Sequence, residues 1–131
     1  SNWVMIVKIP ISLGELVDKI SILLIKEKNI SDEKKLSKIH EELSLLKKTL
    51  NNTINDNSII NYLDKLVEIN AKLWKIEDDI RDCERNRTFD QFFIDLARSV
   101  YITNDKRSEI KNEINKKFGS TIVEVKSYKK Y

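Results

Sequence analysis

Apolar residues recur at alternating intervals of three and four positions along most of the chain, and this spacing restricts the possible folds more than any other feature. It is unbroken in residues 36–50 and continues, with a few polar interruptions, through residues 59–80 and 89–114. Side chains spaced in this way form one stripe along an α-helix. Residues that break helices are scarce, since the 131 residues include two glycines and one proline. The sequence therefore predicts a mainly α protein.

We predict four helices and two strands within a single domain, residues 1–131. The helices are expected over residues 12–29, 31–51, 57–83 and 88–118, and the strands over residues 5–10 and 121–128. The helices should form two antiparallel hairpins in a bundle-like arrangement. The strands, whose residues alternate between apolar and polar, should pair as a small β ribbon that joins the ends of the chain. Residues 1–4 are interpreted as a remnant of cloning, with Met5 as the native start.

Three predicted helix ends carry capping residues. Ser12 and Glu15 form a capping box, in which Ser12 accepts the Glu15 amide hydrogen and the Glu15 side chain reaches back to Ser12. Thr88 and Gln91 form a second capping box at the start of the last helix, and Gly119 is suited to its end.

The first helix contains the run "ISILLI", residues 20–25, which is apolar on nearly all sides. A helix of this kind is covered on more than one face. It is therefore either central in the fold or packed against a second copy of the chain. We expect self-association, as a homodimer, through this helix or through the edge of the ribbon, with another protein partner as a second option.

Charge and cysteine content argue against several classes of protein. The net charge of +3 comes from 24 basic and 21 acidic residues spread along the chain, a mixture that argues against a nucleic-acid partner. No apolar run approaches the roughly 20 residues of a membrane span. Cys83 is the only cysteine, so an internal disulfide is excluded and the reducing cytoplasm is the expected location.

Polar side chains interrupt the apolar register of the two long helices. Asn70 and Glu77 lie in or beside the register of the third helix, and Thr103 and Arg107 lie in that of the fourth, which should run unbroken through "ITNDKR". If the hairpin folds back at about residues 86–87, Asn70 faces Thr103. A guanidinium in an apolar seam needs a carboxylate or carbonyl partner, because an unpaired buried charge costs several kcal/mol. The candidate partners of Arg107 are Asp18, Glu15, Glu68 and Glu77.

Two interpretations of these polar residues stay open. They could form a buried layer that fixes the register of the helices, as a single buried Asn does in coiled coils. They could instead line a ligand pocket between helices. The candidate residues for both are Asp18, Lys19, Asn70, Trp74, Glu77, Arg81, Arg98, Tyr101, Asp105 and Arg107.

Two enzyme classes deserve comparison with the sequence. "GELVDKI" looks like the first motif of all-helical nucleotide pyrophosphohydrolases, in which paired carboxylates on two helices hold magnesium, and Glu15 and Asp18 would supply one pair. The second pair is incomplete, because Ser44 and Leu45 stand where the partner acid belongs. A chorismate-mutase-like bundle would bind a dianion through inward basic residues, but no motif places the candidates Lys19, Arg81, Arg98 and Arg107. We expect no metal and no cofactor.

Three stretches, "KIPISLGELVDKISILLIK", "LWKIEDDIR" and "LARSVYITNDKRSEIKNEIN", resemble a family of short helical bacterial and phage proteins that is catalogued as a domain of unknown function. The resemblance extends from Met5 to about Tyr128. It implies a small cytoplasmic protein of bacterial or phage origin, encoded near genes for cell-surface polysaccharides. It supplies no catalytic residues.

The sequence as a whole favours a non-catalytic binding or assembly module that self-associates. The alternative is a small all-α enzyme or ligand-binding protein that acts on a nucleotide or another anionic small molecule in a pocket lined by Arg, Glu and Tyr. If the polar residues only set the register, replacing Arg107 with Leu should leave folding intact or stabilise it.

Overall fold

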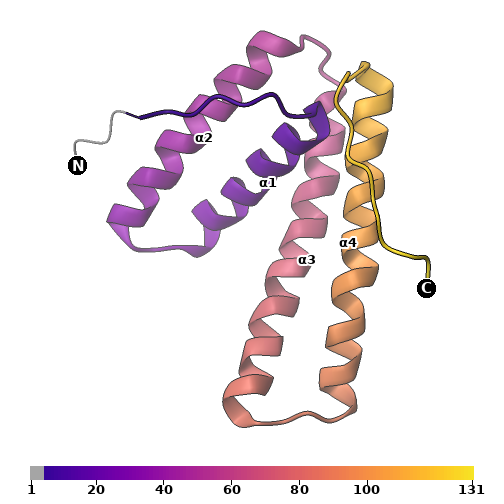
Figure 1. Cartoon of the computed structure of the whole chain (residues 1–131). Coiled ribbons are helices and arrows are strands. Elements are labelled where there is room, and N and C mark those ends of the chain that lie inside the picture. Colours follow the sequence, from indigo (N-terminus) through magenta and orange to yellow (C-terminus); the bar gives the residue numbers. More distant parts are fainter. Residues whose placement is uncertain (1–4) are drawn as a thin grey trace.

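The computed structural model describes residues 5–131, and within them it contains four α-helices arranged as two hairpins (Figure 1). Helix α1 covers Leu13–Asn29, α2 covers Glu33–Thr53, α3 covers Ile59–Asn86 and α4 covers Gln91–Phe118. The prediction of a mainly helical protein with four helices is confirmed. The expectation that residues 1–4 are a remnant of cloning lies outside the described residues.

The hairpins diverge from one another, and α1 is the helix that joins them. Helix α1 contacts each of the other three helices, whereas α2 packs against α1 alone. The α3–α4 hairpin continues past the end of α1, so that its distal part is only two helices thick (Figure 1). This central position accounts for the run of residues 20–25, whose side chains are buried or half-buried within one chain.

The apolar side chains form two separate cores. The larger one lies where the hairpins meet, and its fully buried members include Val17, Leu66 and Ile114. The smaller one lies in the distal part of the α3–α4 hairpin. It consists of Ile76, Cys83 and Leu96, with the half-buried Ile80, Phe93 and Val100 packed against it.

The helix ends follow the predicted caps only in part. Ser12 Oγ accepts the Glu15 amide hydrogen at 3.0 Å, as predicted. The return bond of the capping box is replaced, because the Glu15 carboxylate binds Lys111 at 2.7 Å. Helix α4 begins later than predicted: Asp90, rather than Thr88, is the N-cap and accepts the Phe93 amide hydrogen.

The predicted run of α4 through residues 102–107 is continuous. Its C-terminal cap is Gly119, whose φ of +72° lies in the left-handed region that favours glycine. Arg87, with φ of +53°, ends α3 in the same conformation and so delays the start of α4.

The predicted β ribbon is wrong, since residues 5–131 contain no strand. The two segments expected to pair follow different paths. Residues 5–10 are exposed and lead into α1, whereas residues 121–128 run along α4 (Figure 1).

Side-chain contacts with α4 replace the ribbon in the C-terminal segment. The Glu124 carboxylate lies 3.1 Å from Lys111 Nζ, and Lys126 forms an ion pair with Asp105. Glu124 and Lys126 are two residues apart, so the alternation that resembled a strand puts both on the side that faces α4. An isolated two-stranded ribbon is marginal in water, and these ion pairs offer the segment another position.

None of the helices within residues 5–131 is both long and apolar enough to cross a membrane.

Candidate functional site

The centre of the site is an ion pair between α1 and α4. Arg107 Nε donates to Asp18 Oδ1 at 2.9 Å, and Arg107 Nη2 donates to Asp18 Oδ2 at 2.5 Å. The Asp18 side chain is 0% exposed and that of Arg107 is 26% exposed. The hydrogen bonds to Asp18 raise the pKa of Arg107, and this effect outweighs desolvation of the guanidinium. Bidentate pairing of this kind is the strong form of an Arg–carboxylate contact.

Asn70 of α3 joins the pair and connects the third helix to it. Its side-chain Nδ2 donates to Asp18 Oδ1 at 2.9 Å and to Ser21 Oγ at 2.7 Å. Ser21 Oγ in turn donates to the backbone carbonyl of Asp18 at 2.6 Å. The side chains of Asp18, Ser21, Asn70 and Arg107, called the polar layer below, therefore hold α1, α3 and α4 in one relative position.

A second ion pair between α1 and α4 lies one turn away. Lys111 Nζ is 2.7 Å from Glu15 and 3.1 Å from Glu124, and Lys111 is only 5% exposed. Desolvation lowers the pKa of Lys111, but its hydrogen bonds to Glu15 and Glu124 outweigh this effect, so the net shift is upward. Lys111 was not among the residues predicted for the site. The sequence did contain a signal for this residue: Arg107 and Lys111 lie one helical turn apart on α4, as Glu15 and Asp18 do on α1.

The two pairs account for the carboxylates of the predicted metal motif. Asp18 faces Arg107 and Asn70, and Glu15 faces Lys111 and Lys19. Each carboxylate thus lies against a cation. The part of the chain that the structure describes also contains no cluster of three or more His, Cys, Asp or Glu side chains arranged to hold a metal ion.

The first turn of α1 lies very close to the last turns of α4. The Gly14 amide donates to Asn115 Oδ1 at 2.7 Å, and the Leu13 amide lies 3.2 Å from Ser120 Oγ. A Cβ atom on Gly14 would approach the Lys111 carbonyl oxygen to 2.4 Å. A glycine is therefore required at this position of α1.

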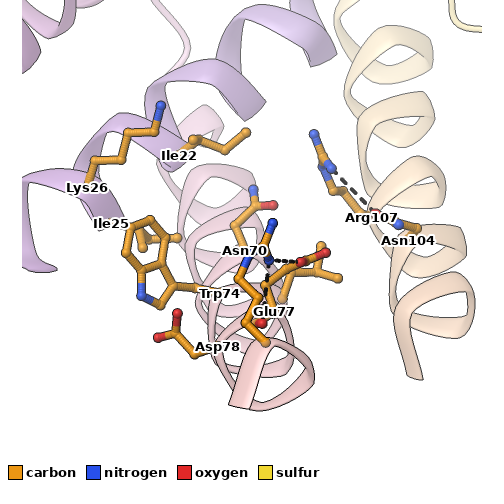
Figure 2. Close-up of a pocket in the computed structure, with 11 residues that line it drawn as sticks. Ile22, Ile25, Lys26, Asn70, Trp74, Glu77, Asp78, Asn104 and Arg107 are labelled. Atoms are coloured by element: carbon orange, nitrogen blue, oxygen red, sulfur yellow. Dashed lines mark hydrogen bonds and ion pairs between the residues drawn. The ribbon is translucent and has the colours of Figure 1, made fainter. Parts of the chain in front are cut away.

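An open groove of about 470 Å³ lies below the polar layer, where α1 separates from the α3–α4 hairpin (Figure 2). Its apolar lining comes from α1 and α3, and Figure 2 shows Trp74 of α3 beside Ile25 of α1, with Arg107 and Asn104 on α4. The residues that line it are Ile22, Ile25, Lys26, Asn70, Leu73, Trp74, Glu77, Asp78, Arg81, Asn104 and Arg107.

The charges around the groove balance. Lys26, Arg81 and Arg107 are cationic, and Glu77, Asp78 and the adjacent Asp18 are anionic. Glu77 and Arg81 pair with each other on the surface, where their side chains are 49% and 64% exposed.

The structure separates the ten candidate residues into several groups. Asp18, Asn70 and Arg107 belong to the polar layer, and Trp74, Glu77 and Arg81 line the groove with Asn70 and Arg107. Lys19 is exposed and forms a 3.8 Å pair with Glu15, and Arg98 is exposed on α4. Tyr101 and Asp105 contact the C-terminal segment instead, through Tyr131 and Lys126.

The contact of the C-terminal segment with α4 also shifts the pKa values of two side chains, Asp105 and Tyr131. A hydrogen bond from Lys126 lowers the pKa of Asp105. A hydrogen bond to Asp105 raises the pKa of Tyr131, whose ring packs edge-on against Tyr101 at 5.1 Å. Neither group lines the groove.

Comparison with known proteins places the chain in a family. A family of unknown function, DUF6165, matches residues 7–131, which is nearly the whole chain. The chain belongs to the DUF6165 family. The resemblance to a domain of unknown function noted in the sequence is thereby confirmed. No curated protein and no solved structure matches the chain. The function of this DUF6165 chain therefore has to be inferred from the side chains described above.

Proposed function

We propose that the chain is a non-catalytic binding module whose groove between the two hairpins receives an amphipathic segment of a protein partner. One observation carries the proposal: an open, largely apolar groove lies directly against a polar layer in which the charged groups are already paired. Most ligand grooves combine apolar walls with a few fixed polar groups in this way.

The pairing of the charged groups argues against catalysis. Asp18 accepts three side-chain hydrogen bonds and is 0% exposed, so it has neither free lone pairs directed at a substrate nor access to one. A general base must lie within hydrogen-bonding reach of the proton that it removes. Glu77, which does reach the groove, is exposed and paired with Arg81.

The dimensions of the groove suit a peptide segment. Its α3 side extends from Asn70 to Arg81, and these eleven steps of helix span about 16 Å. Ile22, Leu73 and Trp74 are half-buried and supply apolar contacts along this length. Within residues 5–131, α2 packs only against α1, so it does not cover this side.

The balanced charge disfavours the alternative occupant, a nucleotide or another anionic small molecule. Sites for phosphate use cations and backbone amides that are free to turn toward the ligand. Here the bidentate contact with Asp18 fixes the orientation of Arg107 and balances its charge, and Glu77 pairs with Arg81. Glu77 and Asp78 would also repel an anion that entered from solvent.

Self-association stays a proposal, with less support than the sequence suggested. A second copy was expected because α1 is apolar on nearly all sides. In the structure, α2, α3 and α4 of the same chain cover that helix. A second copy is therefore one of the outcomes of the experiment below. A cytoplasmic location is likewise proposed, and the free thiol of Cys83 is in keeping with a reducing compartment.

The proposal is tested by selecting peptides from a displayed random library on the full chain and measuring their affinity for two variants. Trp74→Ala removes the aromatic wall of the groove and should weaken binding about tenfold or more. Tyr101→Ala removes an aromatic ring from α4 outside the groove and should leave the affinity unchanged. No selected peptide, or equal loss in both variants, would contradict the proposal.

Two further measurements test the other possible occupants of the groove, a small molecule and a second copy of the chain. Thermal-shift assays with nucleotides and nucleotide sugars, with and without magnesium, should show no stabilisation. A saturable shift that disappears in Trp74→Ala would support the small-molecule alternative instead. Light scattering of the wild type and of Trp74→Ala would show dissociation of a dimer in the variant if a second copy fills the groove.

A further inference from the structure

We infer that Asn70 and Arg107 form a main-chain recognition subsite at the upper end of the groove, which binds the N–H and the C=O of one residue in an extended segment. This inference rests on the proposed function and specifies the chemistry and the conformation of the occupant. It depends on two adjacent side chains, one of which presents a free acceptor and the other free donors.

The acceptor is the side-chain oxygen of Asn70. Asn70 is 6% exposed and lines the groove. Its amide nitrogen must face α1, because the Asp18 carboxylate there can only accept, and because Ser21 Oγ already gives its hydrogen to the Asp18 carbonyl. Both N–H bonds of Asn70 are therefore used, and its Oδ1 is directed away from α1. Among residues 5–131, no side chain or backbone group donates a hydrogen bond to this oxygen.

The donors are the remaining N–H groups of Arg107. A guanidinium has five, of which one from Nε and one from Nη2 bind Asp18. The contact of Nη1 with Asn104 Oδ1 is long, at 3.4 Å. Arg107 lines the groove and its side chain is partly exposed, so the other N–H groups are accessible.

The two groups are neighbours, since Asn70 Nδ2 and Arg107 Nε both donate to the same oxygen, Asp18 Oδ1, each at 2.9 Å. A complementary ligand group therefore carries an acceptor and a donor side by side. A single trans peptide group does not have this pattern, because its C=O and N–H point in opposite directions. One residue of an extended segment does, because its own N–H and C=O point to the same side: the C=O accepts from Arg107 and the N–H donates to Asn70. A carboxylate or phosphate offers acceptors only, and would place a lone pair against Asn70 Oδ1 at a cost in free energy.

The need for free main-chain N–H and C=O groups also selects the conformation of the bound segment. Amides inside an α-helix are already hydrogen-bonded to one another, and only the end turns have free groups. A residue whose N–H and C=O bind Asn70 and Arg107 therefore belongs to an extended stretch. About five extended residues match the length of the groove, with their apolar side chains against Ile22 and Trp74.

Four probes that share one branched carbon skeleton test the subsite on the full chain. They are N-acetyl-leucine N-methylamide (the diamide), its analogue in which an ester oxygen replaces the leucine N–H (the ester), the primary amide 4-methylpentanamide and the carboxylate 4-methylpentanoate. Nitrogen–proton NMR follows the Trp74 indole N–H, which reports occupation of the apolar groove. The Asn70 side-chain NH₂ and the Arg107 Nε–H report the subsite.

We expect the diamide to bind about fivefold more tightly than the ester, which is the effect of one hydrogen bond of ordinary strength. It should shift all three signals, whereas the ester should shift mainly that of Trp74. In Asn70→Ser the preference for the diamide over the ester should disappear. In the matched control Asn104→Ser, which changes an asparagine on α4 of the same groove, the preference should persist.

Four results would overturn the inference, and they differ in what they leave standing. Equal affinity for diamide and ester, with Trp74 still shifted, removes the subsite but keeps the proposed function. If the carboxylate binds most tightly, the subsite recognises an anion instead of the main chain. If the primary amide alone binds, the subsite recognises the side chain of an Asn or Gln instead. If no probe shifts the Trp74 or the Asn70 signal, both the subsite and the proposed function fail.

Discussion

The two halves of the α3–α4 hairpin share one pattern of seam residues but differ in what surrounds them. In the half beside α1, Leu66 and Ile114 are 0% exposed, and so is the side chain of Asp18 in the polar layer. In the distal half, Phe92 is 53% exposed although it adjoins a seam residue. A two-helix hairpin can bury one stripe of each helix, and a third helix is needed to bury more. How much of the side-chain surface of the α3–α4 hairpin is buried therefore depends on how far α1 extends along it.

The contrast is clearest in the two Arg–carboxylate pairs. Asp18–Arg107 lies under α1 and is closed to water on the carboxylate side, while Glu77–Arg81 connects successive turns of α3 at the surface. Buried pairs are costly to break because one charge is left without a partner, whereas exposed pairs contribute little. The following predictions test this difference between the halves.

The largest effect is expected from Arg107→Leu. Loss of the guanidinium leaves the fully buried Asp18 carboxylate with Asn70 as its only side-chain partner, and we expect a decrease of about 3–5 kcal/mol in the free energy of unfolding, measured by urea denaturation. The structure thus reverses the expectation from the sequence that this change would be neutral or stabilising. That expectation holds when both charges are removed, so Asp18→Leu combined with Arg107→Leu should recover much of the loss.

The matched control in the exposed pair is Arg81→Leu. It should change the free energy of unfolding by less than about 1 kcal/mol, because both partners are hydrated. Equal losses in Arg81→Leu and Arg107→Leu would mean that α1 does not distinguish the two halves.

The second prediction concerns the two apolar cores. Leu66→Ala should cost about 4 kcal/mol and Leu96→Ala about 2 kcal/mol, because surroundings that can relax lower the cost of a cavity. Leu66 is enclosed by the larger core, and Leu96, at 9% exposed, belongs to the smaller one. Amide hydrogen exchange should agree, with faster exchange in residues 80–96 than in residues 63–70. Uniform protection along the hairpin would contradict the comparison.

The third prediction tests how α1 is held against the half that it covers. Gly14→Ala should cost about 3 kcal/mol, since the new Cβ would meet the Lys111 carbonyl and force α1 away from α4. Gly119→Ala provides the comparison: its Cβ would have open space, and only the left-handed backbone opposes it, at about 1 kcal/mol. Urea denaturation of both variants measures the difference, and a smaller loss in Gly14→Ala would show that the helices can separate freely.

The same comparison explains which features the sequence could predict. Helix content followed from local spacing, and Ser12 and Gly119 could be recognised because a cap depends only on its own helix end. The unbroken course of α4 followed from the seam on both sides of residues 102–107. Each of these depends on residues close together in the chain.

Features that depend on the placement of whole helices could not be predicted in the same way. Asp18 was one of four possible partners of Arg107, and nothing local ranked it above Glu77. Arg98 and Tyr101 share a helix with Arg107 but project outside the groove, a direction set by where α1 lies. The ribbon was wrong because alternation of apolar and polar residues fits a strand and also fits an extended segment that lies along a helix.

Within the half that α1 covers, the smallest loss is expected at Lys111, because its partners Glu15 and Glu124 remain hydrated. Lys111→Met keeps the apolar part of the side chain, and Glu15 and Glu124 are 32% and 39% exposed. We therefore expect a loss of about 1 kcal/mol at neutral pH. The pKa of Lys111 is raised in the folded state, so the folded protein holds this proton more tightly than the unfolded chain.

The contribution of Lys111 should accordingly be complete below the pKa of an unfolded lysine, about 10.4, and decline as the pH rises through the folded value. Urea denaturation between neutral pH and pH values above this range should show the difference between wild type and Lys111→Met shrinking toward zero. Tyr131, whose pKa is also raised, produces a decline of the same sign, and the measurement is therefore repeated in a Tyr131→Phe background. A difference that stays constant with pH would mean that the Lys111 ammonium is not held by Glu15 and Glu124, and that Asp18–Arg107 is the ion pair that fixes α1 on α4.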